Sequence, residues 1–249
     1  MKTEWDYSKL AKSYSLRPQY SPTVISTIFK IVASAHKPVA CDVGAGTGHL
    51  TLHLAKYCDK IIAVEPNTKM LEIGKERTAE MADISWKQAT AENTTLPNGC
   101  CDLVTFGSSF NVCDRSAALA EASRLTVDQG WFSCMWNHRK LEDAVQQRIE
   151  SIIKGHITEY DYGARREDQT EILHDVGLFS EIIQIQSRVD HKVRVDDFIG
   201  AWNSHATLER QAGSKFIDIV REIEKYLRSL KSSHITVPYN TRAWIARFK

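Results

Sequence analysis

A glycine-rich turn at residues 44–48 constrains the fold of this chain more than any other feature. The apolar run Val39–Val43 contains one acid, Asp42, and three glycines then alternate with small residues. Such a run is typical of a buried parallel strand, and the glycines allow a ligand to approach the backbone closely. Helical spacing of apolar residues follows over 48–57. The sequence therefore predicts a strand, a turn and a helix, which form a ligand crevice in doubly wound sheets.

The spacing of this turn narrows the class of ligand. Nicotinamide and flavin proteins use G-x-G-x-x-G, but here the third glycine of that pattern is replaced by His49. The Gly-Lys-Ser/Thr of a phosphate-binding P-loop is also missing from the segment. A second buried run, Ile61–Val64, ends in Glu65. An acid at this offset from a glycine turn can accept hydrogen bonds from ribose hydroxyls. Pro66 then ends the strand, and Asn67 is typical of a helix N-cap.

Four motifs in sequence resemble one large enzyme class. They are Asp42–Gly48, Ala63–Asn67 with Met70, Ala89–Glu92 with Leu96-Pro97, and Cys101–Thr105. In this order and spacing the chain resembles the class I S-adenosylmethionine-dependent methyltransferases over about residues 20–137. Within that class it resembles the compact small-molecule family, methyltransferase type 11, which includes UbiE-like and trans-aconitate-methyltransferase-like enzymes.

The resemblance implies S-adenosyl-L-methionine as cofactor and S-adenosyl-L-homocysteine as product. It places the methionine part on the glycines, the ribose at Glu65 and the adenine at Thr90 and Ala91, with Glu92 supporting that loop. Gly107 and Ser108 would line the crevice after the fourth strand. The residues expected at the cofactor are Asp42, Gly44, Ala45, Gly46, Gly48, Glu65, Pro66, Met70, Thr90, Ala91, Glu92, Gly107, Ser108, Arg17 and Tyr20.

Alternating strand and helix patterns predict an α/β fold, a doubly wound and mostly parallel seven-stranded sheet. Expected strands cover 39–43, 60–65, 83–87, 101–107, 129–136, 181–187 and 242–248, with turns at Asp128–Gly130 and Asn240. Expected helices cover 22–35, 48–57, 67–80 and 114–125, and helical patterns dominate 138–175 and 195–230. We expect a single domain over 1–249. Segments 1–20, 138–165 and 190–213 are extra to the sheet core and are expected to form a lid that shapes the acceptor pocket.

The composition limits the partners and the location. The net charge is +1 with acids and bases interspersed, which argues against nucleic acid as the main partner. The six cysteines form neither C-x-x-C pairs nor a framework, as expected of reduced thiols in the cytoplasm. No signal peptide or membrane-spanning run is apparent. The sequence leaves the oligomeric state open.

Three residues are candidates for acid–base or hydrogen-bonding roles. His138 follows the fifth expected strand, and His205 lies in a Trp-Asn-Ser-His run; either has the intrinsic pKa of a general base. Asn111, after the fourth strand, could hydrogen-bond the acceptor. His49 and His53 are four residues apart, but Leu50 stands where a zincin needs glutamate, so no metal site is predicted.

Aromatic residues suggest the shape of the acceptor. We expect a planar or mostly apolar acceptor to contact Trp5, Tyr7, Tyr14, Phe110, Trp136 and Trp202. The predicted reaction transfers a methyl group to an O, N or C nucleophile of a small molecule, in secondary metabolism for instance. Three alternatives stay open: a methyltransferase acting on RNA or protein, a non-catalytic cofactor-binding partner protein, and a nicotinamide oxidoreductase, the last disfavoured by His49.

Overall fold

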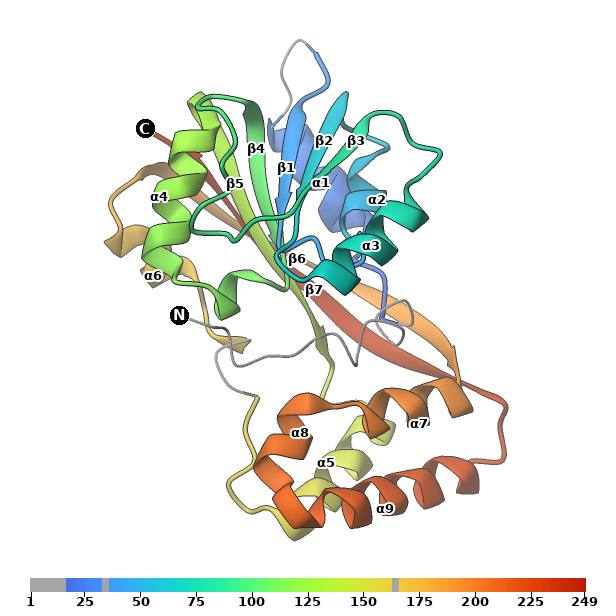
Figure 1. The fold of residues 1–249 in the computed structure, drawn as a ribbon. Coiled ribbons are helices and arrows are strands. Elements are labelled where there is room, and N and C mark those ends of the chain that lie inside the picture. The colour runs from blue at the N-terminus through green and yellow to red at the C-terminus, as the bar shows by residue number, and fades with distance from the viewer. Residues whose placement is uncertain (1–16, 33–35, 163–165) are drawn as a thin grey trace.

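A computed structural model describes residues 17–32, 36–162 and 166–249. Its centre is a seven-stranded sheet in the order β3-β2-β1-β4-β5-β7-β6 (Figure 1). The strands are β1 Val39–Val43, β2 Lys60–Val64, β3 Ile84–Lys87, β4 Cys101–Gly107, β5 Thr126–Arg139, β6 Phe179–Arg194 and β7 His234–Phe248. Strands β1 to β5 are parallel, and β7 is antiparallel to β5 and β6. The prediction of a doubly wound, mostly parallel sheet is confirmed.

Helices alternate with the first five strands, except between β3 and β4, and then dominate the second half of the chain. They are α1 Pro22–Val32, α2 Thr51–Leu54, α3 Thr68–Arg77, α4 Arg115–Leu125, α5 Ala144–His156, α6 Thr170–Asp175, α7 Val195–Asn203, α8 Ala206–Ala212 and α9 Phe216–Ser229. Short 3-10 turns, η3 and η5, cover Phe110–Val112 and Gly213–Lys215. Asn67 caps α3 as predicted, because its side-chain oxygen accepts from the backbone N–H of Met70 at 3.1 Å.

Two apolar cores cover the two faces of the sheet. On one face α1 and α2 pack against β1, β2, β4, β5 and β7, with Ile25 and Ile28 of α1 almost fully buried. On the other face α4 and α6 pack against an aromatic group that includes Phe106 and Phe132, whose ring centroids lie 5.6 Å apart. The sheet is therefore covered on both sides, as its nearly continuous apolar strands require.

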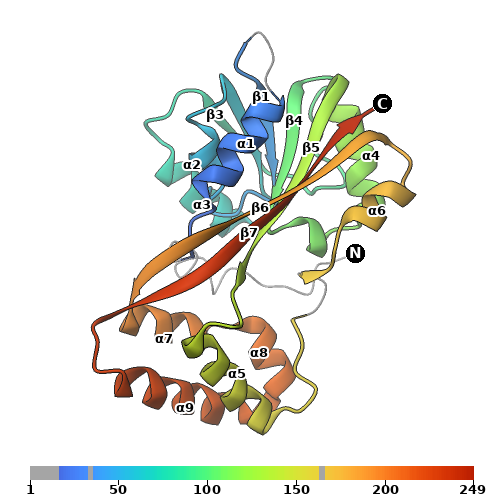
Figure 2. The same ribbon diagram turned by 180° about the vertical axis from the view of Figure 1, so that it is seen from behind.

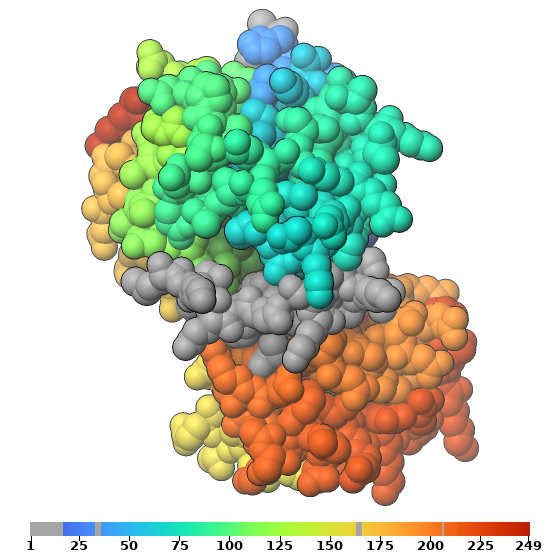
Figure 3. All heavy atoms as spheres, in the orientation of Figure 1, coloured from blue at the N-terminus to red at the C-terminus, as the bar shows by residue number. Residues whose placement is uncertain are grey.

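A third core lies away from the sheet, in a helical layer formed by α5, α7, α8 and α9 (Figure 1). Seen from behind, β6 and β7 run diagonally from the sheet to this layer (Figure 2). Their far ends join its core through Val193, Ile235 and Val237. In the space-filling view α8 and α9 belong to a lower mass, distinct from the mass that contains the sheet (Figure 3). The helical layer is thus attached to the sheet by paired strands as well as by connecting loops.

The structure corrects several predicted boundaries. Helix α2 covers four residues rather than the predicted 48–57, because 46–50 form turns. Strand β6 extends to Arg194 instead of ending at 187, and β7 is continuous through Pro238 and Asn240, where the sequence predicts a turn. Strand β5 begins at Thr126, and a register shift replaces the turn predicted at 128–130. Gln129, with φ of 56°, lies within this irregularity.

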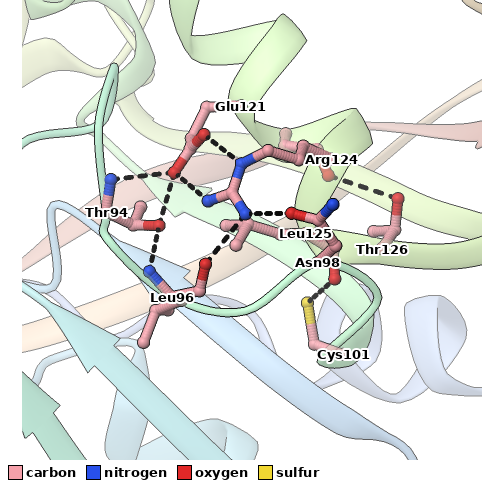
Figure 4. A network of polar contacts seen from close by, with 9 residues as sticks. Thr94, Leu96, Asn98, Cys101, Glu121, Arg124, Leu125 and Thr126 are labelled. Atoms are coloured by element: carbon pink, nitrogen blue, oxygen red, sulfur yellow. Dashed lines mark hydrogen bonds and ion pairs between the residues drawn. The ribbon is translucent and has the colours of Figure 1, made fainter.

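A partly buried ion pair anchors the loop that connects β3 to β4 (Figure 4). Glu121 of α4 accepts from the backbone N–H of Thr94 at 2.8 Å and is paired with Arg124 at 2.7 Å. Arg124 also donates to the carbonyl of Leu96 at 2.8 Å. The hydrogen bonds from Arg124, together with those from Thr94, lower the pKa of Glu121 to about 2. The loop after the predicted adenine-binding residues is therefore fixed to α4.

Two negative findings hold for the described ranges 17–32, 36–162 and 166–249. No helix there is both long and apolar enough to cross a membrane. No group of three or more His, Cys, Asp or Glu side chains is arranged there to hold a metal ion.

Candidate functional site

A cavity of about 510 Å³ lies at the carboxyl ends of the parallel strands. The segments following β1, β2, β4 and β5 supply its walls, and α7 and α8 contribute Ala201, Ser204, His205 and Thr207. Since β1 and β4 are neighbours whose connections leave in opposite directions, the cavity lies at the switch point where such sheets bind ligands. The helical layer thus forms part of the wall of a sheet-edge cavity.

The glycine turn forms the inner wall and requires glycine at specific points. Gly44 and Gly46 have φ of 69° and 59°, in the region that L side chains rarely adopt. A Cβ atom on Gly44 would lie 2.5 Å from Cβ of Ser109, whose hydroxyl donates to the carbonyl of Val43 at 2.7 Å. The turn therefore packs directly against the segment that follows β4.

Glu65 connects the glycine turn to the start of α3. One carboxylate oxygen accepts from the backbone N–H of Gly46 and the other from that of Asn67, both at 2.8 Å. The side chain lines the cavity although the residue is only 7 % exposed. Burial raises the pKa of Glu65, and the two backbone N–H groups oppose that shift. The carboxylate is thus held rigidly at the cavity, with lone pairs left for a ligand hydroxyl.

Asp42 is fully buried at the end of β1, yet it lines the cavity. Its Oδ2 accepts from the hydroxyl of Thr51 at 2.6 Å, whereas Oδ1 has no partner among the described residues. Burial, followed by the charge of Glu65, raises the pKa of Asp42 to about 7, against the hydrogen bond from Thr51. An unpartnered buried carboxylate oxygen is costly, which indicates that a ligand donor is expected there.

The segment 17–21 is fixed across the mouth of the cavity by residues that the sequence does not single out for this role. Asn137 donates to the carbonyls of Pro18 and Gln19 at 2.9 and 3.0 Å. His49 contacts the same Pro18 carbonyl at 3.0 Å. The hydroxyl of Thr241 accepts from the backbone N–H of Ser21 at 2.7 Å and donates to Asn137. These contacts hold Arg17 and Tyr20, two predicted cofactor residues, in the cavity wall.

Ser108 marks strain at the end of β4. Its φ of 61° is unusual for a residue other than glycine. Its hydroxyl lies 3.0 Å from the hydroxyl of Tyr20, and its backbone N–H donates to the carbonyl of Met135 at 2.8 Å. A Cβ on the preceding Gly107 would approach the Tyr20 hydroxyl and Leu50 to 3.1 and 3.0 Å. This part of the wall is therefore closely packed around a strained backbone.

The three candidate catalytic residues all line the cavity, with different hydrogen-bonding capacity. The side-chain oxygen of Asn111 accepts from the indole N–H of Trp136 at 2.9 Å, so the amide offers its N–H groups to a ligand. Nδ1 of His205 accepts from the backbone N–H of Leu208 at 3.2 Å and caps α8. The proton of a neutral His205 ring is therefore on Nε2, which makes the ring a donor. His138, near the carboxyl end of β5, also lines the cavity, and its role as general base stays a prediction.

Several residues predicted at the site lie behind its walls or elsewhere. Phe110, Trp136 and Trp202 are at most 1 % exposed, because they pack in the apolar cores. These side chains do not line the cavity and instead contact residues that do. Trp136 donates to Asn111, and Trp202 stacks on His205 with ring centroids 4.9 Å apart.

The predicted adenine loop and the N-terminal aromatics have different outcomes. Gly48, Thr90, Ala91 and Glu92 are not among the residues lining the cavity. Glu92 instead accepts from the backbone N–H of Asp114, the N-cap of α4. Trp5, Tyr7 and Tyr14 lie outside the described residues. The cofactor roles assigned to Asp42, Gly44, Ala45, Gly46, Glu65, Pro66, Met70, Gly107, Ser108, Arg17 and Tyr20 agree with their positions in the wall and stay predictions.

The basic part of the wall could not be recognised in the sequence. Arg139, Tyr162, Arg166 and Tyr239 line the cavity, and none of them belongs to a recognisable motif. Arg166 lies within residues 138–175, for which the sequence predicts only a charged and mostly helical region. Only Arg139 of this group could have been suspected from the sequence, because it directly follows His138 at the carboxyl end of β5.

Comparison with known proteins identifies the domain. Residues 41–134 match the family model described as a methyltransferase domain. A putative methyltransferase of Dictyostelium discoideum is 25 % identical over 231 residues, which cover 89 % of this chain and 84 % of that protein. The ubiquinone/menaquinone biosynthesis C-methyltransferase UbiE of Zymomonas mobilis is 33 % identical over 97 residues, covering 38 % of this chain and 40 % of UbiE.

Among solved structures, a putative type II methyltransferase from Anaeromyxobacter dehalogenans shares the fold, with a TM-score of 0.62 and 17 % identity. The match covers 94 % of this chain and 97 % of the chain of that structure. The match to the family model coincides with β1 to β5, the strands whose carboxyl ends form the cavity. Residues 41–134 therefore carry a methyltransferase domain of the class that uses S-adenosylmethionine as cofactor.

Proposed function

We propose that this protein transfers the methyl group of S-adenosylmethionine to a small molecule enclosed between the sheet and the helical layer. The observation that carries the proposal is the composition of one cavity wall. It combines the glycine turn, Glu65 and Asp42 with residues from the end of β5 and from α7 and α8. A wall that draws on both layers suits an acceptor small enough to be surrounded.

The cofactor fits this wall on two observations. Gly44 and Gly46 leave a backbone surface free of Cβ atoms, which allows close approach. Oδ1 of Asp42 is a buried acceptor without a described partner, complementary to a cationic amino group. Glu65, Asp42 and the turn would therefore hold the cofactor. When bound, S-adenosylmethionine supplies a methyl group on a positively charged sulfur that a nucleophile can displace.

The remaining residues would position the acceptor. The N–H groups of Asn111, oriented by Trp136, can donate to an oxygen of the acceptor. His138 can take a proton from a hydroxyl or ring nitrogen near neutral pH. His205 can donate from Nε2. Alignment of the reacting atoms and exclusion of water account for most of the rate expected from such a site, with proton transfer as a smaller contribution.

Two measurements test the proposal. Calorimetry should detect binding of S-adenosylhomocysteine and no binding of NAD or NADP. Release of S-adenosylhomocysteine should then be measured with pools of small metabolites, with RNA and with unfolded protein as acceptors. We expect turnover with the small metabolites. Turnover with RNA or protein alone would contradict the proposed acceptor class, and binding without any turnover would favour a non-catalytic partner protein.

We expect cofactor affinity to fall as the pH is lowered through neutrality. If ionised Asp42 binds the amino group, protonation removes an attractive charge; at about pH 6, one unit below its pKa of about 7, roughly nine-tenths of the carboxyl is protonated. The dissociation constant of S-adenosylhomocysteine should therefore rise about tenfold between about pH 8 and pH 6. Asp42→Asn should bind weakly at both pH values. A wild-type affinity that does not change, or that improves at low pH, would contradict this role.

A cytoplasmic location and a single-domain organisation with lid segments at 1–20, 138–165 and 190–213 remain predictions. The third lid segment is supported by Ala201, Ser204, His205 and Thr207, which contribute to the cavity wall.

A further inference from the structure

Two arginines separate the main cavity from a second, smaller hollow. Arg139 ends β5, and Arg166 lies between α5 and α6. Both line the main cavity, and both also line a hollow of about 200 Å³, as does His138. Arg166 donates to the backbone carbonyl of Arg139 at 3.0 Å. The Arg166 guanidinium is thus fixed to the backbone of Arg139, and both residues lie at one end of the proposed acceptor site.

Aromatic rings contact these two charges. The guanidinium carbon of Arg139 lies 4.2 Å from the ring centroid of Trp202, and that of Arg166 lies 4.4 Å from Tyr162. Within the described ranges neither arginine makes an ion pair with a carboxylate. Arg242, which lines the same small hollow, is paired with Asp168. Nε of Arg139 donates to the hydroxyl of Tyr239 at 3.4 Å, and one N–H of Arg166 donates to the Arg139 carbonyl. Aromatic faces position a guanidinium without using its N–H groups, so the other N–H groups of each arginine can bind a ligand.

Acidic groups nearby compensate the two charges incompletely. Glu150 of α5 interacts electrostatically with Arg139 and Arg166, although burial raises its own pKa. Burial likewise lowers the pKa of Arg166, the direction expected of a cation that has lost water without gaining a full counter-charge. The small hollow has one acidic residue among its described lining, Glu142, beside Arg139, Lys140, Arg166 and Arg242. Lys140 is paired with Glu142 and Arg242 with Asp168, so Arg139 and Arg166 face Glu150 as the remaining acid named here.

The main cavity is consequently polarised. Its acids lie at the carboxyl ends of β1 and β2, with Asp42 inside β1 and Glu65 directly after β2, whereas Arg139 is the last residue of β5. Two strands, β1 and β4, lie between β2 and β5, which separates the ends of β2 and β5 by roughly 14 Å. The hydroxyl of Tyr162, in the basic wall, is buried and has no hydrogen-bond partner among the described residues. It is a further donor at the positive end.

We propose that the acceptor carries an anionic group, a carboxylate or a phosphate, which binds to Arg139 and Arg166 while its reacting atom faces Asn111 and His138. The inference rests on the proposed function, because it concerns the acceptor end of that site. A guanidinium group can bind either anion through two parallel N–H···O bonds, and burial strengthens such bonds. The acceptor is therefore acidic, in addition to any apolar part that fits the cavity.

Binding of small probes tests the inference with cofactor product present. In saturating S-adenosylhomocysteine, calorimetry should detect binding of succinate or inorganic phosphate and no binding of uncharged succinamide. Arg166→Gln and Arg139→Gln should each lower the affinity for the anion about tenfold or more, since a charge-assisted hydrogen bond is lost. Arg221→Gln, a change of equal charge on the exposed side of α9, should leave binding unchanged. A preference for succinate or for phosphate shows whether the anionic group of the acceptor is a carboxylate or a phosphate.

The outcomes separate this inference from the proposed function. If S-adenosylhomocysteine does not bind the wild-type protein, the proposed function fails. If it binds and neither anion does, or if the anion binds Arg166→Gln equally well, the inference alone fails. Arg166→Lys guards against misfolding, because it keeps the charge and should retain part of the affinity. In turnover assays, the anion-exchange fraction of a metabolite extract should contain the acceptor; activity confined to the neutral fraction would overturn the inference.

Discussion

Replacing Glu65 by alanine is expected to weaken S-adenosylhomocysteine binding at least about 100-fold, because several hydrogen bonds are lost together. The carboxylate accepts from the backbone N–H groups of Gly46 and Asn67, so its removal leaves two donors without partners in a buried region. The glycine turn and the start of α3 would lose their connection. The free energy of unfolding should fall by about 3 kcal/mol, since each unsatisfied buried donor costs about 1–3 kcal/mol.

Glu65→Gln separates the structural from the ligand-binding contribution. The amide keeps one acceptor oxygen but presents an N–H₂ group to the second backbone donor. Stability should therefore recover in part, whereas cofactor affinity should stay low because the acceptor proposed for the ribose hydroxyls is altered. Calorimetry and urea unfolding of the three proteins measure both quantities. An affinity of Glu65→Gln equal to that of the wild type would show that this carboxylate does not bind the cofactor.

Gly44→Ala should be the most damaging change in the glycine turn. The new Cβ would lie 2.5 Å from Cβ of Ser109, and the backbone would keep a φ of 69°. The left-handed backbone costs about 1–2 kcal/mol, and displacement of a packed side chain adds about 1–3 kcal/mol. We expect the free energy of unfolding to fall by about 3 kcal/mol and cofactor binding to be lost, because the turn must shift.

Gly99→Ala is the matched control for this substitution. Gly99 has a similar φ of 58°, but no described atom lies within 4 Å of the position that an added Cβ would take. The free energy of unfolding of Gly99→Ala should therefore fall only by the backbone contribution, about 1 kcal/mol, and the variant should keep its affinity for the cofactor. The difference between the two variants isolates the contact with Ser109. If both variants unfold at the same urea concentration and bind equally, Ser109 adjusts freely and the close packing of the turn is unimportant.

The parallel half of the sheet and the positions of the glycine turn and Glu65 could be predicted from the sequence for a physical reason. Buried parallel strands are apolar throughout, and their ends coincide with glycine or an acid, as at Gly44 and Glu65. Strand β6 lacks this signal. Its residues are alternately exposed, and polar residues such as Gln184 and Arg188 interrupt the apolar pattern. Pro238 suggests a break in β7, yet the strand continues, with Pro238 opposite Asp190.

The acceptor end could not be predicted because it depends on tertiary structure. A tryptophan such as Trp136 is equally compatible with a core and with a pocket, since both environments bury aromatic rings. Arg139 and Arg166 are separated by α5 in the chain and meet only when the helical layer packs beside the sheet. The same holds for Asn137 and Thr241, whose hydrogen bond joins β5 to β7. Such contacts leave no periodic pattern in the sequence.

The position of β7 determines the order in which the molecule can be completed during synthesis. Strand β6 precedes β7 in the chain. In the sheet β7 lies between β5 and β6, so β6 pairs with β7 and has no contact with β5 in the strand order. A growing chain therefore exposes β6 before its partner has been made, with α7, α8 and α9 translated in between. Because β7 also contributes to the core of the helical layer and supplies Tyr239 to the cavity, one late strand completes three structures. Ribosome-bound chains that stop before residue 234 would contain the glycine turn but lack the contribution of Tyr239 to the cavity wall.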